Sequence, residues 1–375
     1  MLRHRFGLSC CVCAAFLAAA IAMGPLRAQE LEHYQPATYD QEEVGPLWAY
    51  ARSAPAKPGE TYVPQNPERG AEGLRRGDDE VEVSKLWTVT GSDQQFSRLD
   101  FRNKEGYPDW FPGDHPPMPK VNTVGSESLG NTRRACAVCH LANGKGRPEN
   151  APPGGQPAAY TIQQLQDMRN DLRNTSDPKK SNPHTMVRLA KGMTEDEMKE
   201  IAAYYEAIPW TPWIRVIETD MAPAMHLEEG NMFITVGVEP ALPLNGIIIE
   251  SPENERESNF LRSPRSGWNA YVPVGSLAKG EALVTNGGGK TVACGVCHGT
   301  DLIGVGIMPG IAGRSPSYMM RQLWDMKMET RKGPNVALMM PVMENLTVED
   351  MTNIVAYLAS LMPLPGPVAP PTPRP

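Results

Sequence analysis

The sequence predicts a mainly α-helical protein with two related helical domains, an irregular connector with some β-structure between them, and a loop-rich extension before them. Three observations lead to this prediction. Two segments of the chain repeat one another at fixed spacings, each repeat ends in a capped amphipathic helix, and the segments outside the repeats are rich in proline and glycine. A chain of 375 residues is long enough for two or three compact units.

The first 28 residues have the pattern of a secretory signal peptide. Basic Arg3 and Arg5 precede an apolar stretch, and residues 26–28 offer a cleavage site before Gln29. An uncleaved membrane anchor is the competing interpretation, although the apolar stretch is short for a span. A lipid anchor is disfavoured because the three cysteines of this segment precede the apolar run instead of following it. We therefore expect an exported, periplasmic protein.

Residues 29–125 are expected to form a loop-rich N-terminal extension. This stretch lacks long helical periodicity, and it ends in a run rich in proline and aromatic residues at 107–119. We expect it to wrap over the domain that follows, and a strip for docking a partner protein is the alternative.

All four cysteines of the mature chain belong to two Cys-x-x-Cys-His pentapeptides. Cysteines three positions apart lie one helical turn apart, so both thiols can attach to one edge of a haem while the next histidine binds its iron. We therefore predict two covalently bound haem c groups, with attachment at Cys136, Cys139, Cys294 and Cys297 and iron ligation by His140 and His298.

Zinc sites and redox-active dithiols also use the Cys-x-x-Cys spacing. One zinc site would have to join cysteine pairs separated by about 150 residues, whereas structural zinc sites draw their ligand pairs from nearby sequence. A thioredoxin-like dithiol should lie near a βαβ pattern, and neither pentapeptide has one. The presence of two copies in matching repeats favours haem over both alternatives.

The two repeats are predicted to be domains at residues 126–210 and 274–362. A tyrosine and a Gln-Leu pair follow each pentapeptide histidine at identical spacings, at Tyr160, Gln164, Tyr318 and Gln322. Each repeat then ends in a predicted helix with a threonine N-cap, Thr194 or Thr347, and an acidic residue three positions later. One stripe of each helix is apolar and is expected in the core, namely Met198, Ile201, Tyr205, Met351, Ile354 and Leu358.

Residues 211–273 differ from the repeats and are predicted to form a connector. Met232–Val236 and Gly246–Glu250 are strand candidates among proline-rich turns, which allow a small β-hairpin. Residues 363–375 are dominated by proline and are expected to be an extended or disordered tail.

Each repeat resembles a class I cytochrome c domain, in which the pentapeptide lies on an early helix and a C-terminal helix packs across the first. The resemblance covers about half of the chain and implies a tandem two-haem cytochrome with two cytochrome c-like helical domains. The extension and the connector fall outside the family pattern. The same resemblance implies that the carbonyl of Pro309 accepts a hydrogen bond from His298, with Ala151 at the matching position of the first repeat.

The family places a methionine, the second axial ligand of the iron, shortly before the last helix. In the first repeat this position is Met186, and His184 is the alternative. The same distance before the second helix gives Met339, with Met340 as the alternative and Met343 close behind. The remaining histidines of the mature chain have no comparable placement and are expected to face solvent or to bond locally, at His33, His115 and His226.

Histidine and methionine together would fill both axial positions and leave no open site on the iron. We therefore expect a carrier of single electrons between a periplasmic dehydrogenase and a downstream cytochrome or oxidase, and not an enzyme. The alternative is a haem-bearing subunit of an oxidoreductase complex, or a two-haem enzyme such as a peroxidase or a sulfur-compound oxidising protein.

The charge of the chain limits its partners. The formal net charge is −7, and it becomes −10 when the signal peptide and its three arginines are removed. An acidic protein is a poor ligand for nucleic acid, and it suits a basic docking face on a redox protein. No second apolar stretch is long enough to span a bilayer, so membrane association is expected to be at most peripheral.

Overall fold

The computed structural model describes most of the chain between residues 107 and 362, together with shorter stretches before it. The expected signal peptide and proline-rich tail lie outside the described residues, and so does His33. No helix among the described residues is both long and apolar enough to cross a membrane. The described residues are 34, 39–61, 85–97, 100, 107–228, 232–235 and 241–362.

The first repeat forms a helical domain in which α5 packs against both α6 and α7. Thr194 caps α7 as predicted, because its side chain accepts from the Glu197 amide and the Glu197 side chain accepts from the Thr194 amide. The predicted stripe of Met198, Ile201 and Tyr205 is buried. The helices are α4 (Ala137–His140), α5 (Ala158–Arg169), α6 (Ser181–Gly192) and α7 (Glu195–Glu206).

The second repeat forms a domain of the same kind, in which α12 packs against α8 and α10. Thr347 and Asp350 form the predicted capping box of α12, and Met351, Ile354 and Leu358 are buried. The mainly α fold expected from the sequence is therefore confirmed. The helices are α8 (Ser276–Asn286), α9 (Gly295–His298), α10 (Pro316–Lys327), α11 (Met340–Met343) and α12 (Val348–Ser360), and a short hairpin of β10 (Gly304–Val305) and β11 (Met308–Pro309) lies between α9 and α10.

The two domains differ at their first helix. In the second domain α8 crosses α12 at Gly280, where a Cβ atom would overlap the carbonyl oxygen of Asn353. In the first domain the matching segment is a single turn, α3 (Lys120–Thr123). Asn122 stands where the second domain has Gly280, and its side chain accepts a hydrogen bond from the Tyr205 hydroxyl at 2.9 Å. A polar contact thus replaces a close helix crossing.

The connector holds more β-structure than the sequence predicted. A hairpin is present, formed by β5 (Met225–Glu228) and β6 (Met232–Thr235), and β4 (Met221–Pro223) pairs with β7 (Ala241–Pro243). The structure adds a three-stranded sheet in the order β3–β9–β8, in which β3 and β9 are parallel and β8 and β9 antiparallel. Its strands are β3 (Ile214–Glu218), β8 (Ile249–Pro252) and β9 (Trp268–Val272).

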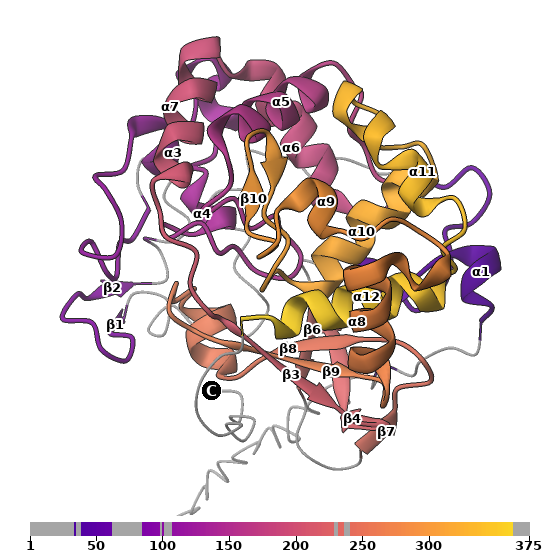
Figure 1. Cartoon of the computed structure of the whole chain (residues 1–375). Helices are drawn as coiled ribbons and strands as arrows, with labels where there is room; N and C mark the ends of the chain where they lie inside the picture. The colour runs from indigo at the N-terminus through magenta and orange to yellow at the C-terminus, as the bar shows by residue number, and fades with distance from the viewer. Residues whose placement is uncertain are drawn as a thin grey trace, which may run out of the picture. The chain divides into compact units, whose positions relative to one another are not determined.

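This sheet shares one hydrophobic core with the second domain. Figure 1 shows β3, β8 and β9 next to α8 and α12, and β3 contacts α12 directly. Buried Ile249 and Trp268 of the sheet belong to the same cluster as Met351 and Ile354 of α12. The connector is therefore part of the fold of the second domain and not a free linker.

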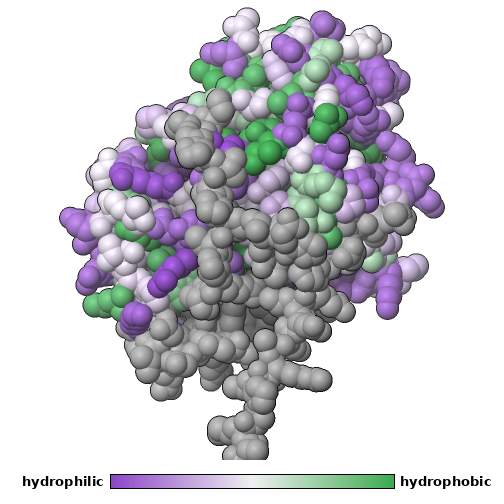
Figure 2. Space-filling view, turned by 90° about the horizontal axis from the view of Figure 1, so that it is seen from below, coloured by the Kyte–Doolittle hydropathy of each residue, from purple (hydrophilic) through white to green (hydrophobic). Residues whose placement is uncertain are grey.

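The described parts of the extension are short elements within packed loops. The 3₁₀-helix η1 (Leu47–Tyr50) is buried against α10. Further along, Trp110 packs with Leu261 of the connector and donates its indole N–H to the Leu261 carbonyl at 3.0 Å. The other elements are α1 (Gln41–Val44), β1 (Leu86–Trp87) and β2 (Phe96–Ser97). On the face seen in Figure 2, hydrophobic residues lie scattered among hydrophilic ones.

Candidate haem sites

Each domain contains one large pocket, and each pocket is lined by one pentapeptide. Both pockets open to solvent, and together with the space at their openings they hold about 1740 Å³ and 1330 Å³. The first is lined by Cys136, Cys139, His140 and Met186, and the second by Cys294, Cys297, His298 and Met339.

The pentapeptides form single-turn helices at the edge of each pocket, α4 and α9. One turn brings the two thiols of each pair to the same pocket, as attachment to one haem requires. The two pairs belong to different pockets, and no group of three or more His, Cys, Asp or Glu side chains in the described part of the chain is placed to hold a metal ion. A shared four-cysteine zinc site is therefore absent from these residues.

Both pentapeptide histidines are fixed by a backbone carbonyl. The Nδ1–H of His298 donates to Pro309 O at 2.8 Å, and that of His140 donates to Ala151 O at 2.7 Å. A carbonyl can only accept, so the proton is on Nδ1 and Nε2 keeps its lone pair for a metal. Burial lowers the pKa of both imidazoles and favours this neutral form. The donor set thus fits a covalently held haem iron.

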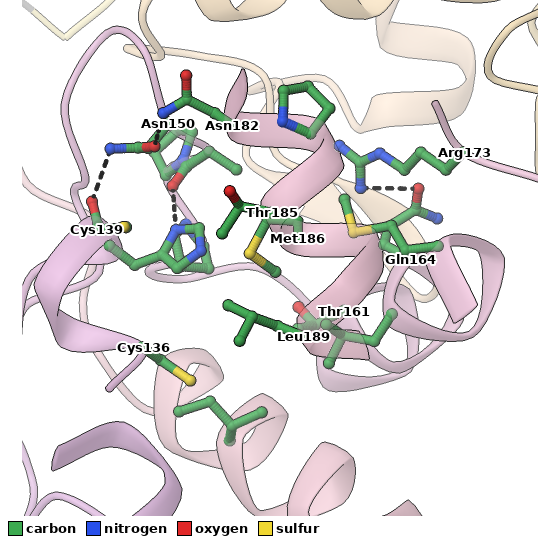
Figure 3. A pocket seen from close by; sticks show the side chains of 18 of the residues that line it. Cys136, Cys139, Asn150, Thr161, Gln164, Arg173, Asn182, Thr185, Met186 and Leu189 are labelled. Atoms are coloured by element: carbon green, nitrogen blue, oxygen red, sulfur yellow. Dashed lines mark hydrogen bonds between the residues drawn. The ribbon is translucent and has the colours of Figure 1, made fainter. Parts of the chain in front are cut away.

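On the opposite side of the first pocket, Met186 and His184 are placed differently. Met186 lines the pocket from α6, and Figure 3 shows its side chain between Thr185, Leu189 and Thr161. His184 is not among the lining residues, and its Nε2–H donates to the Pro178 carbonyl at 3.1 Å. Residues two apart on a helix face different directions, so only one of the pair can reach the pocket.

The candidate methionines of the second domain also differ in whether they line the pocket. Met339 lines the second pocket, whereas Met340 and Met343 do not. Met340 begins α11, and it packs against the cluster of Met343 and Val336, as Met339 also does. Of the two candidate sulfur atoms at this position, only that of Met339 belongs to a residue of the pocket wall.

The other described histidines lie away from both pockets. The Nδ1–H of His115 donates to the Pro116 carbonyl at 2.8 Å, and its Nε2 lies 3.2 Å from Asp109 Oδ1. His226 is buried on β5 in the connector. Neither residue lines a haem pocket.

The two pockets share a polar wall. Arg173 Nη2 donates to Tyr318 Oη at 3.1 Å and to Gln322 Oε1 at 2.8 Å, and its Nη1 donates to Gln164 Oε1 at 3.1 Å. Arg331 makes the corresponding hydrogen bonds from the other domain, donating to Gln322, Tyr160 and Gln164. The backbones of the two arginines pair in an antiparallel bridge. Five side chains line both pockets, namely Gln156, Tyr160, Gln164, Tyr318 and Gln322.

The sequence identified Tyr160, Gln164, Tyr318 and Gln322 of this wall only as signs of duplication, and neither Gln156 nor the two arginines were predicted. A signal for them was present, because Arg173 and Arg331 each lie 33 residues after a pentapeptide histidine. Their pairing across the domain boundary depends on how the two domains meet, which no spacing within one repeat encodes.

The chain is similar in sequence to known proteins. The cytochrome c family model matches residues 125–207 and 277–362. Cytochrome c-554(548) of Halomonas halodenitrificans is 39% identical over 72 residues, which are 19% of this chain and 87% of that protein. The thiosulfate dehydrogenase electron acceptor of Stutzerimonas stutzeri is 26% identical over 230 residues, or 60% of this chain and 79% of that protein.

Two solved structures are also similar. Cytochrome c4 of Acidithiobacillus ferrooxidans has a TM-score of 0.38 and 20% identity, covering 60% of this chain and 98% of its own. A thiosulfate dehydrogenase of Marichromatium purpuratum has a TM-score of 0.40 and 24% identity, covering 63% of this chain, which spans only 38% of that chain. The chain described here therefore belongs to the cytochrome c family and carries two covalently bound haem c groups, one in each helical domain.

Proposed function

We propose that this protein is a periplasmic two-haem carrier that takes single electrons from a dehydrogenase and delivers them to a downstream cytochrome or oxidase. The observation that supports this most strongly is the wall of five side chains common to both haem pockets. When bound, each haem supplies an iron that takes up or releases one electron. Two such sites with one wall between them suit transfer from one domain to the other.

The proposed ligand set leaves no open coordination position. His140 with Met186, and His298 with Met339, line the two pockets and supply one nitrogen and one sulfur for each iron. Thioether sulfur favours reduced iron and raises the reduction potential. Saturated ligation supports electron transfer over intrinsic catalysis, which needs a vacant or displaceable ligand.

We further propose that the polar wall holds haem carboxylates between the domains. Arg173 and Arg331 are buried, and each guanidinium is already oriented by a tyrosine and two glutamines. A planar guanidinium binds a carboxylate with two parallel hydrogen bonds. Each arginine contacts side chains of the other domain, so binding at this wall would also hold the domains together.

The mouth of the second pocket is the proposed point of exchange with partner proteins. Cys297 is exposed, and Val292, Ile307 and Leu338 line the pocket while remaining exposed to solvent. Exposed apolar side chains grouped at a functional opening are typical of protein docking sites. An electron would therefore enter or leave through the second domain.

The nature of the donor is suggested by one relative. The Stutzerimonas stutzeri protein is named as the electron acceptor of a thiosulfate dehydrogenase, and its similarity extends over 230 residues of this chain. We propose a dehydrogenase of this class as the donor. The competing proposal, a haem-bearing subunit or a two-haem enzyme that oxidises sulfur compounds itself, makes a different kinetic prediction.

Stopped-flow mixing of the oxidised protein with thiosulfate, with and without a thiosulfate dehydrogenase, separates these proposals. A carrier accepts two electrons in total, one at each haem, only when the dehydrogenase is present. Reduction by thiosulfate alone at a catalytic rate would contradict the carrier proposal. Reduction by neither mixture would contradict this choice of donor.

A further inference from the structure

The loops that carry the two histidine-binding carbonyls are each held by a side chain of the other domain. In the second domain, Pro309 is followed by Gly310. The side-chain amide of Gln156, in the first domain, donates to Gly310 O at 2.9 Å and accepts from Gly310 N at 2.8 Å. Both backbone polar groups of Gly310, the residue after the His298 acceptor, are thus occupied by a residue of the first domain.

The corresponding loop of the first domain is held by a residue of the second domain. In the first domain, Ala151 is followed by Pro152. Arg314, in the second domain, donates from Nη1 to Pro152 O at 2.7 Å and to Gly154 O at 2.9 Å. Arg314 is 3% exposed, and its guanidinium carbon lies 3.5 Å from the centroid of the Trp210 ring. The loop next to the His140 acceptor is therefore held by a residue of the second domain.

Gln156 and Arg314 occupy the same position of the duplicated sequence, 16 residues after His140 and His298 respectively. Each reaches across the domain boundary instead of binding its own loop. One is neutral and the other charged, and hydrogen bonds from a charged donor are roughly twice as strong as neutral ones. The two loops are therefore held by bonds of different strength.

The hydrogen bond from a ligating imidazole to its carbonyl acceptor fixes the ring and makes the ligand more basic. A more basic imidazole stabilises ferric iron and lowers the reduction potential. Any residue that fixes the acceptor loop thus acts on the potential through the histidine. We propose that Gln156 and Arg314 are positioning residues that act across the domain boundary, each setting the hydrogen bond of the other domain's haem-binding histidine. This inference rests on His140 and His298 being the iron ligands of the proposed function.

The test uses the whole haem-loaded protein and the Gln156→Met variant, which keeps the side-chain volume and loses both hydrogen bonds to Gly310. The readout is the solvent exchange of the histidine Nδ1 protons, measured by NMR in the reduced protein with labelled histidine. We expect exchange at His298 to become about tenfold faster and exchange at His140 to stay unchanged. A tenfold change corresponds to about one hydrogen bond of typical strength, here the bond from His298 to the Pro309 carbonyl. Gln166→Met is the matched control, because Gln166 lies on α5 and its side-chain amide donates to the exposed carboxylate of Glu195, in its own domain, at 3.3 Å.

Redox titration followed by NMR gives the second readout. In Gln156→Met the potential of the second haem should rise while that of the first stays constant, although the change is made in the first domain. Arg314→Gln, which places the first domain's residue in the second, should speed proton exchange at His140. Gln156→Glu keeps the acceptor for Gly310 N and should give an intermediate exchange rate at His298.

The inference is overturned if exchange at His298 in Gln156→Met equals that in the Gln166→Met control, or if the potential shift falls on the first haem. Its failure differs from a failure of the proposed function. Loss of the sulfur-to-iron absorption in the unaltered protein would contradict methionine ligation, and the histidine exchange rates would still decide the role of Gln156.

Discussion

The two haem domains have similar pockets, but they differ in how far the edge of the pentapeptide is exposed to solvent. In the second domain Val296, inside the pentapeptide, is 73% exposed. Its counterpart Val138 is partly buried, and the Val138 carbonyl accepts a hydrogen bond from Arg262 of the connector at 2.5 Å. The same pentapeptide edge thus faces solvent in one domain and the chain itself in the other.

The residues beyond the pentapeptide diverge in the same direction. Val305 and Ile307 are 58% and 46% exposed in the second domain. Arg147 and Glu149 stand at the matching positions of the first domain, are 6% and 3% exposed, and form an ion pair. The two domains thus have the same residue types at the proposed haem ligands but different surfaces. This surface is apolar and exposed in the second domain, and polar and buried in the first.

The connector and the extension cover the first domain. Arg147 donates to Asn259, the Asn143 amide donates to the Pro264 carbonyl at 2.5 Å, and Lys145 donates to the Pro212 carbonyl at 3.3 Å. All three acceptors lie in the connector. Segments outside the cytochrome c pattern therefore cover this face of the first domain, in agreement with the proposal that partners meet the second domain.

The largest expected effect comes from removing one haem at a time. Cys294→Ser with Cys297→Ser should reduce the haem content from two per chain to one and also destabilise the connector sheet, because that sheet shares its core with α12. Cys136→Ser with Cys139→Ser should lose one haem and leave the sheet intact. Haem content by mass spectrometry and thermal unfolding check this, and equal destabilisation by both variants would contradict the shared core.

Opening one axial position should produce the next largest effect. Met339→Ala is expected to remove the sulfur-to-iron absorption of one haem, lower its potential and allow rapid cyanide binding, because the axial ligand sets potentials over a range of about 0.8 V. Met340→Ala is the control and should change none of these. Cyanide titration and redox titration provide the measurement, and the reverse result would make Met340 the ligand.

The helix crossing present only in the second domain offers a test of stability. Gly280→Ala should destabilise that domain by about 3 kcal/mol, since the added methyl overlaps the Asn353 carbonyl oxygen. Gly113→Ala is the control, because no atom lies within 4 Å of a Cβ at that position. Denaturant unfolding followed at each haem checks the prediction, and equal loss at both haems would show that the domains unfold together.

The smallest expected effect concerns partner docking. Val292→Asp should slow electron exchange with a redox partner by about tenfold, as expected for loss of one apolar contact at the centre of an interface, because Val292 lines the second pocket and is 48% exposed. Val274→Asp is matched in chemistry and exposure, since Val274 is 60% exposed and does not line the pocket. If both variants exchange electrons at the same rate, the partner does not dock at the second pocket.

Local signals in the sequence predicted much of this structure. The pentapeptides, the capping boxes at Thr194 and Thr347 and the apolar stripes behind them depend on spacings of a few residues, which a helix encodes directly. The parallel pairing of β3 and β9 was missed because 49 residues separate the two strands along the chain. Arg173, Arg331, Gln156 and Arg314 were missed because their partners lie in the other domain.

Optical redox titration of the oxidised protein in the presence of cyanide tests the central claim most directly. A two-haem carrier with histidine and methionine at each iron should show the red sulfur-to-iron absorption at both haems. It should also take up two electrons in two one-electron steps and bind cyanide slowly at either site. Rapid cyanide binding at one haem, together with absence of its red absorption, would contradict saturated ligation and favour catalysis.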